Sequence, residues 1–285
     1  ATSPEALAAW LAGRRWFAGP GPGADAATRH LLPLGAPPAP SIGLVDVVTA
    51  AGTDRYQTVV AADAPAPDVA DDPVVAGALV AFATGQQATP ASPWGAVRGR
   101  WLPGAPPPGT APARPLGGEQ SNTSVAVGGT HVLKLYRRLR PGPHPELEVG
   151  RHLAVVAGRG RSVPVAPLAG WLELSAPADP GEAPDPAAAT ALAVVQGLVP
   201  GALDGWTLAL SALAGDPGGF LARLHELGTA VAHLHGALAE PADPSIDPPD
   251  DDGRFGVVAL DRARIDEVAA AIDHDSRNLA PKPDA

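Results

Sequence analysis

The chain of 285 residues contains no cysteine, which excludes disulfide bonds and thiolate metal ligands and removes any reason to expect secretion. It also lacks the basic-then-apolar layout of a signal peptide, and no window of about 18 apolar residues could cross a bilayer. We therefore expect a cytoplasmic protein that does not contact membranes.

Aromatic and basic residues are both scarce. Aromatic residues make up 4% of the chain, and since six of them are tryptophan, each Trp is expected to anchor a local cluster. The 20 Lys and Arg residues are outnumbered by 30 Asp and Glu residues, which gives a net charge of −10. Nucleic acid is not an expected partner, because the cations that would neutralise its phosphates are too few and too scattered. An anionic nucleotide would need a local basic site.

Glycine and proline are abundant, with 33 and 35 residues, so we expect long loops around a modest core. The densest stretch, Pro103–Pro115, is interpreted as a Pro/Gly-rich linker that buries nothing. It suggests a boundary between an N-terminal subdomain over residues 1–102 and the part of the chain that begins at residue 116.

Hydrophobic periodicity and turn residues predict an α+β fold in which strands precede most of the helix. Asp72-Pro73 is typical of a helix start, and Gly128-Gly129 of a tight hairpin turn. Helices are predicted over about residues 3–17, 74–83, 145–156, 219–238 and 261–272. Strands are predicted over 42–50, 55–62, 97–102, 123–127, 131–136, 163–174 and 191–199.

Lys134 stands out in the stretch GGEQSNTSVAVGGTHVLKLYRR. Neighbouring residues of a strand alternate between its faces, so Lys134 points away from its two leucine neighbours, and an outward-facing strand lysine is one interpretation. In the other, the polar segment 119–124 offers N–H groups and hydroxyls to phosphate oxygens, and Glu146 or Glu148 of the next helix pairs with the lysine. Kinases combine a strand lysine, a helix glutamate and a phosphate-covering loop in this way.

The segments GEQSNTSV, VLKLYRRL and PELEVGRHL resemble the maltokinase family, which are ATP-dependent kinases with the aminoglycoside-phosphotransferase-like, protein-kinase-like fold. The segment WLAGRRWFAG resembles the N-terminal cap of that family, VAPLAGWLE its next strand, and VVQGLVPGALDGW its hinge followed by an Asp-Gly-Trp turn. This resemblance runs from residue 5 to about residue 240. It implies a bilobal kinase fold with an N-terminal cap subdomain over residues 1–102, an N-terminal lobe with the hinge over 116–200, and the start of an incomplete helical C-terminal lobe over 201–285.

The resemblance also implies roles for individual residues. Lys134 would hold the α- and β-phosphates of ATP, and Glu148 would orient it, with Glu146 as second choice. A hydroxyl-rich loop would cover the phosphates, and hinge backbone groups would meet the adenine. A simple hairpin turn and a plain buried strand remain the alternatives for these two segments. The loop residues are Ser121, Asn122, Thr123 and Ser124, and the hinge residues are Gln196, Gly197, Leu198 and Val199.

The groups that carry phosphoryl-transfer chemistry are not found. A kinase needs a base for the acceptor hydroxyl and carboxylates for Mg²⁺, which the resembled family takes from a His-Gly-Asp loop and a later Asp motif. His235-Gly236 is followed by Ala237 inside a predicted helix, and His274–Asn278 follows no apolar strand. No catalytic residue and no metal ligand is therefore assigned, and the chain is expected not to turn over.

The function implied by the resemblance is transfer of the ATP γ-phosphate to a sugar hydroxyl. Maltose, converted to maltose 1-phosphate, is the first choice of acceptor, and glucosamine is the alternative. A trehalose- or maltose-metabolising enzyme is the implied partner. A truncated, non-catalytic module that binds a partner through its N-terminal subdomain remains open as a different class. A binding module without nucleotide would require Lys134 to face solvent with no acid near it.

Overall fold

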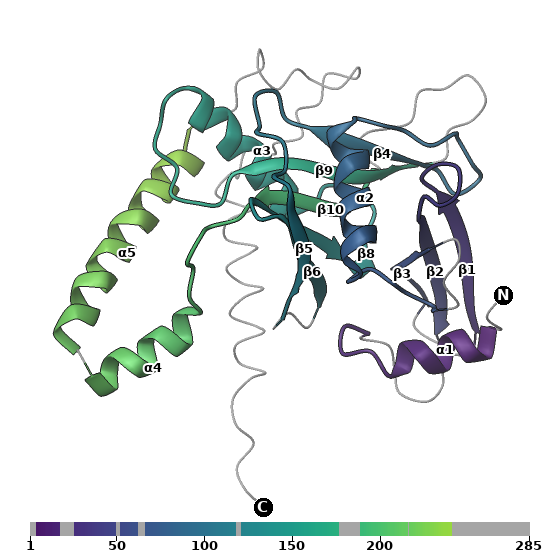
Figure 1. Cartoon of the computed structure of the whole chain (residues 1–285), viewed down its shortest axis with the longest axis horizontal. Coiled ribbons are helices and arrows are strands. Elements are labelled where there is room, and N and C mark those ends of the chain that lie inside the picture. The colour runs from purple at the N-terminus through teal and green to yellow at the C-terminus, as the bar shows by residue number, and fades with distance from the viewer. Residues whose placement is uncertain are drawn as a thin grey trace, which may run out of the picture.

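The computed structural model describes residues 4–17, 26–49, 52–61, 66–117, 121–176, 189–215 and 217–240. Within them lie two antiparallel sheets and five helices. Figure 1 shows the smaller sheet at one end of the molecule, the larger sheet in the middle, and two helices, α4 (Gly205–Gly215) and α5 (Pro217–Leu238), at the other end. The mixed α and β content agrees with the class predicted from periodicity.

The smaller sheet has four strands in the order β1 (Ala26–Pro33), β2 (Ser41–Thr49), β3 (Gly52–Val60) and β8 (Arg138–Leu139). β2 and β3 pair antiparallel and confirm the strands predicted over residues 42–50 and 55–62. β1 was not predicted, because its sequence AATRHLLP has neither alternation nor a run of β-branched residues.

Helix α1 (Pro4–Ala12) packs on this sheet, and aromatic side chains complete the contact. Leu7 and Leu11 are buried, and Trp10, Trp16 and Phe17 pack partly buried against the same cluster. The helix ends five residues earlier than predicted, because the N–H groups of the next two residues bond to carbonyls only three residues back. Residue 3, the first of the predicted helix, lies outside the described residues.

The larger sheet has six antiparallel strands, and its centre is buried. In spatial order they are β4 (Ala96–Trp101), β9 (Leu168–Ser175), β10 (Thr190–Gly197), β7 (His131–Tyr136), β6 (Asn122–Gly128) and β5 (Ala111–Leu116). Gly128 and Gly129 both have positive φ, 66° and 71°, as the predicted tight hairpin between β6 and β7 requires. The first six residues of β10 are buried, as its apolar run predicted.

Strand β5 corrects the expectation that Pro103–Pro115 is a linker throughout. Residues 111–116 pair with β6 at the edge of the larger sheet, although most of their side chains are exposed. Proline lacks the N–H that a central strand needs, but an edge strand tolerates it because only one side is paired. The division into subdomains stays a prediction. Strands from the two sides of the first boundary pair with each other. β4, which precedes the boundary, pairs with β9 in the larger sheet, and β8, which follows it, pairs with β3 in the smaller sheet.

Helix α2 (Pro73–Thr84) covers one face of the larger sheet, where Leu79 and Phe82 join Leu133 and Leu135 in the main core. Asp72 fixes the start of this helix. Its carboxylate accepts hydrogen bonds of 2.8 and 3.1 Å from the backbone N–H groups of the two residues that follow Pro73. The Asp72-Pro73 pair thus begins this helix as predicted.

Asp72→Ala should destabilise the fold by about 1 kcal/mol, because two N–H groups of the first turn lose their acceptor. Urea unfolding followed by circular dichroism measures the change. Asp72→Asn keeps an acceptor oxygen at the same position and should lie within about 0.5 kcal/mol of the wild type. Equal losses in both variants would show that the cap does not fix the helix start.

Three further helices complete the described part of the fold. α3 (Pro145–Gly158) contacts β9 and the end of α5, where Leu153 and Val156 pack with Ala237. α4 was not predicted; its first turn is capped by Asp204, whose carboxylate accepts a 2.7 Å hydrogen bond from the Thr207 N–H, and these contacts lower the pKa of Asp204. The Asp-Gly-Trp turn of the sequence is therefore the start of a helix.

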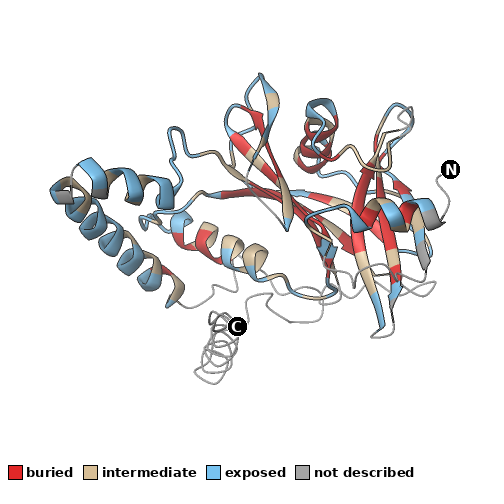
Figure 2. Ribbon diagram, turned by 90° about the horizontal axis from the view of Figure 1, so that it is seen from below, coloured by how far each residue is buried: buried red, intermediate tan, exposed pale blue. Residues whose placement is uncertain are grey.

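Helix α5 confirms the strongest helical pattern in the sequence, yet most of its apolar positions are exposed. Leu224 and Leu227 are 44% and 58% exposed, and Figure 2 shows α4 and α5 as largely exposed helices. His235-Gly236 lies inside α5, as predicted. The predicted helix over 261–272 and the segment His274–Asn278 lie outside the described residues. No helix in the described part of the chain is long and apolar enough to span a membrane.

Candidate functional site

Lys134 lies near the centre of the larger sheet, on β7 between β6 and β10. Its ammonium Nζ is 3.2 Å from Oε2 and 3.4 Å from Oε1 of Glu146, on α3. The two side chains are 24% and 29% exposed, so the pair is partly buried with one side open to solvent. An unpaired, solvent-facing lysine, which a module without nucleotide would require, is not what the structure contains.

Glu146 is held by a second donor besides the lysine. The hydroxyl of Tyr136, two residues after Lys134 on the same face of β7, donates a 2.9 Å hydrogen bond to Glu146 Oε2. The Tyr136 ring in turn stacks on His144, with centroids 4.0 Å apart. A carboxylate fixed by two donors restricts where the lysine ammonium can lie.

The structure reverses the order expected for the two acids. The ion pair with Lys134 is made by Glu146, the second choice, and not by Glu148, the first. Residues two apart on an α-helix point about 200° apart, so the two carboxylates cannot both face the sheet. Both acids lie in the first turn of α3, and only the rotation of the helix about its axis decides between them.

Two of the predicted phosphate-loop residues share the face of Lys134. Ser124 is directly opposite Lys134, and Asn122 is directly opposite Tyr136. Directly opposed residues of an antiparallel pair project to the same face, so both side chains lie on the side of the Lys134–Glu146 pair. Ser121 precedes β6, is exposed, and accepts a 3.3 Å hydrogen bond from the Asn122 amide. The segment is thus a strand start and not a simple turn.

Thr123 is a correction to the predicted loop. It is opposite Leu135, so its side chain projects to the other face of the sheet, away from Lys134. Its hydroxyl accepts a 2.8 Å hydrogen bond from Nε of Arg137, a residue that was not singled out in the sequence. The strand continues to Asn122, and alternation therefore splits a run that was predicted to act as one loop.

The predicted hinge lies at the end of β10 and the two residues after it. Two of its backbone N–H groups already have partners: that of Gly197 donates to the Pro167 carbonyl and that of Leu198 to the Thr130 carbonyl, both at 2.8 Å. Val199 follows the strand and is 52% exposed. An adenine contact through the N–H groups of Gly197 or Leu198 would have to displace these bonds, which makes the carbonyls and Val199 the better candidates.

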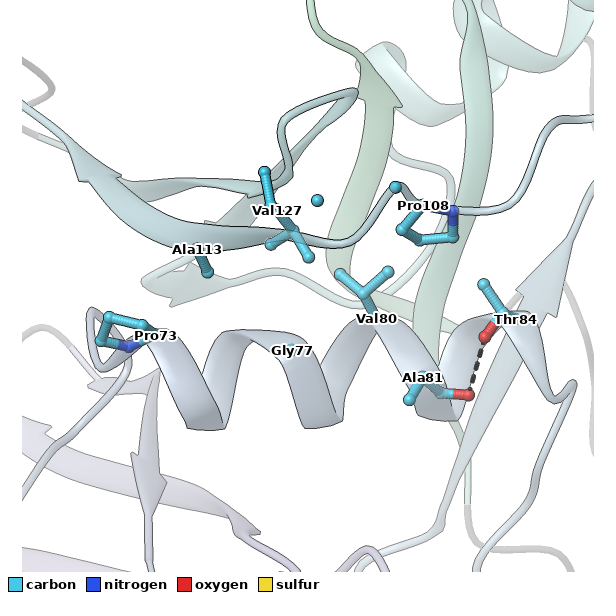
Figure 3. Close-up of a pocket in the computed structure, with 11 residues that line it drawn as sticks. Pro73, Gly77, Val80, Ala81, Thr84, Pro108, Ala113 and Val127 are labelled. Carbon is cyan, nitrogen blue, oxygen red and sulfur yellow. Dashed lines mark hydrogen bonds between the residues drawn. The ribbon is translucent and has the colours of Figure 1, made fainter.

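A pocket of about 370 Å³ lies elsewhere, between α2 and the strands β5 and β6. Figure 3 shows the Val80 side chain of α2 pointing toward Pro108 and Val127, which lie across the pocket. Its lining is mostly apolar, and it lies on the α2 side of the sheet, opposite to Lys134. None of the residues predicted for nucleotide binding lines it. The pocket is therefore not part of the candidate site.

The His144 imidazole sits beside the ion pair, and its surroundings lower its pKa. Burial is the main cause; the Glu146 carboxylate raises the pKa, and the Lys134 ammonium lowers it further. A histidine whose pKa is lowered in the folded state binds more protons when unfolded, so acid favours unfolding once the pH falls below about 6.5. His144 should therefore stay neutral at neutral pH.

The free energy of unfolding should fall as the pH is lowered from 7 to 5, and His144→Phe should reduce that fall. Phenylalanine keeps a ring against Tyr136 but cannot be protonated, and one group contributes at most about 1.4 kcal/mol per pH unit. Urea unfolding at several pH values measures the difference. His225→Gln, which changes an exposed histidine of α5, serves as control. Parallel pH profiles for the wild type and His144→Phe would contradict the expectation.

Metal-binding carboxylates are not gathered in the described part of the chain. Among those residues no group of three or more His, Asp or Glu side chains could hold a metal ion. No step through the Mg²⁺ that kinases use is assigned to this chain. The catalytic base likewise stays unassigned.

Part of the chain is similar to known glucosamine kinases. It is 33% identical over 139 residues to a glucosamine kinase of Mycolicibacterium smegmatis, an overlap that covers 46% of this chain and 32% of that protein. A solved structure of a glucosamine kinase aligns with 79% of this chain and 48% of its own, at 24% identity and a TM-score of 0.47. No protein-family model matches the chain.

These similarities concern part of the compared proteins. The chain spans about a third of the length of the curated glucosamine kinase and about half of the solved one. Both compared proteins are named glucosamine kinases.

Proposed function

We propose that this chain forms the ATP-binding part of a sugar kinase, with an amino sugar such as glucosamine as the acceptor and maltose as the less favoured choice. The ion pair between Lys134 and Glu146 carries the proposal. It joins a central strand to the first turn of a helix, the relation by which kinases hold the α- and β-phosphates. The bilobal arrangement with an N-terminal cap belongs to the same proposal.

The side chains near Lys134 suit a polyphosphate. The ammonium group would contact the α- and β-phosphate oxygens, while Glu146 and the Tyr136 hydroxyl keep it at one position. Ser124 and Asn122 project to the same face and would add a hydroxyl and an amide. A cation fixed before binding loses less side-chain entropy when the phosphates arrive.

Other parts of a kinase are assigned by resemblance alone. Mg²⁺ would neutralise charge on the phosphates of ATP, and no described residue is assigned as its ligand. The adenine would lie near the end of β10, close to Val199. The cytoplasmic location and a partner enzyme of trehalose or maltose metabolism stay predictions.

Parallel assays of the full-length natural protein with ATP, Mg²⁺ and either glucosamine or maltose test the acceptor. Mass spectrometry of the sugar products should show glucosamine phosphate as the favoured product, and Lys134→Ala should abolish it. Preferential phosphorylation of maltose would restore the maltokinase interpretation. A failure to phosphorylate either sugar would contradict the proposal.

A further inference from the structure

Arg137 is the most completely bonded charged residue among those the structure describes, and the proposed phosphoryl-transfer site does not use it. Its side chain is 3% exposed and forms an ion pair with Asp68, at 2.9 Å between Nη2 and Oδ2 and 3.1 Å between Nη1 and Oδ1. Nη1 also donates to the Gln57 carbonyl at 3.3 Å, and the guanidinium lies 4.9 Å above the Trp16 ring. Bidentate pairs of this kind fix a side chain strongly in one geometry.

The partners of Arg137 come mainly from the N-terminal part of the chain. Asp68 Oδ1 additionally accepts from the Val59 N–H at 2.8 Å, and the Gln57 N–H donates to the Arg137 carbonyl at 2.7 Å. The guanidinium is therefore held by β3, by the loop before α2 and by the segment after α1. The remaining guanidinium nitrogen, Nε, donates across to Thr123 at the start of β6.

Thr123 lies between Asn122 and Ser124, the two residues of β6 that project to the same face of the sheet as Lys134. A hydrogen bond that fixes its side chain on one face of β6 also fixes the directions of Asn122 and Ser124 on the other. Arg137 directly follows Tyr136, which binds Glu146 from the opposite face. Two consecutive residues of the chain thus hold both halves of the proposed phosphate site, the carboxylate under Lys134 and the strand beside it.

We infer that Arg137 is a positioning residue for nucleotide binding, which fixes the start of β6 through Thr123 and joins it to the smaller sheet. The inference rests on the proposed function for the identity of the ligand, ATP. It assigns to the N-terminal sheet a part in orienting the phosphate-binding side chains. Arg137 itself does not touch the nucleotide, because it lies on the other face of the sheet.

Thr123→Val is the sharpest test, because it removes the hydroxyl that Arg137 binds and keeps the size of the side chain. Backbone amide hydrogen exchange without nucleotide should be at least about threefold faster over residues 122–124, and ATP should bind roughly three- to tenfold more weakly, the size expected for one typical hydrogen bond. Thr123→Ser keeps a hydroxyl and should restore both values. Isothermal titration with ATP and exchange measured by mass spectrometry give the two readouts.

The matched control is Thr58→Val, which makes the same change at a buried threonine whose hydroxyl contacts only the Gly43 carbonyl in the smaller sheet. It should leave exchange over residues 122–124 and ATP affinity within about twofold of the wild type. If the role of Thr123 were merely structural, backbone amide hydrogen exchange would become faster throughout the chain, or equally in Thr123→Val and Thr58→Val. That result would overturn the inference.

The outcomes for the inference and for the proposed function can be told apart. Unchanged exchange over residues 122–124 in Thr123→Val overturns the positioning role, whatever the affinity for ATP. Equal ATP binding by the wild type and Lys134→Ala overturns the proposed function. Local acceleration of exchange in Thr123→Val supports the positioning of β6 in either case, since that readout needs no nucleotide.

Discussion

Lys134→Ala is expected to weaken ATP binding to this chain by roughly 10- to 100-fold, because a phosphate contact made by a fixed ammonium contributes about 1.5–3 kcal/mol. Isothermal titration of the purified chain with ATP at low ionic strength measures the loss. The expected effect is large because Glu146 holds the ammonium at one place before the nucleotide arrives. After the substitution, Glu146 also presents a negative charge to the phosphates without its cation.

The control for net charge is Arg138→Met, which removes one positive charge from β8. Arg138 pairs with Asp54 on the smaller sheet, and both side chains are more than a third exposed. Its loss should change the affinity for ATP by less than about twofold at physiological salt, since exposed charges are screened. If Arg138→Met weakens ATP binding as much as Lys134→Ala does, the affinity for ATP depends on the net charge of the chain, and the role of Lys134 is contradicted.

Arg137→Met should destabilise the fold by about 3–5 kcal/mol, because it leaves the buried Asp68 carboxylate without its cation. The Asp68 side chain is 10% exposed, so water compensates little. Methionine fills most of the volume of arginine, which limits the contribution of a cavity. Urea unfolding followed by tryptophan fluorescence measures the loss and also reports on Trp16, which lies against the guanidinium.

The same Arg138→Met variant is the matched control, since the substitution is identical and the residue is adjacent. An exposed ion pair contributes about 0–1 kcal/mol, so this variant should unfold close to the wild type. Similar losses at positions 137 and 138 would contradict the claim that burial makes the Arg137–Asp68 pair important. A loss at position 137 of less than about 1 kcal/mol would do the same.

The elements that the sequence predicted are those with strong local signals. The hairpin at Gly128-Gly129, the helix after Asp72 and the apolar strand β10 each depend on turn chemistry or periodicity within a few residues. β5 and α4 were missed for the opposite reason. APARPL has no apolar alternation and forms a strand only because β6 offers an edge, and α4 begins within an Asp-Gly-Trp segment that was interpreted as a turn.

The candidate site was predictable in part. Alternation along β7 already placed Lys134 away from the core face, and the following helix offered the acid. The choice between Glu146 and Glu148 depends on the rotation of α3, which no local spacing encodes. If Ser124 had been assumed to lie opposite Lys134, strand alternation would have predicted that the Thr123 side chain points to the other face of the sheet. The Arg137–Asp68 pair joins residues 69 positions apart, and only the packing of the two sheets brings them together.

Covalent labelling of the lysine tests the central claim most directly. The chain has two lysines, Lys134 and Lys282, so each serves as a reference for the other. An acyl-phosphate derivative of ATP transfers its acyl group to an amine held beside the phosphates, and proximity should favour Lys134 by at least about tenfold. Mass spectrometry of the digested chain should show labelling of Lys134 that excess ATP prevents. Equal labelling of both lysines, unaffected by ATP, would contradict a nucleotide site at Lys134.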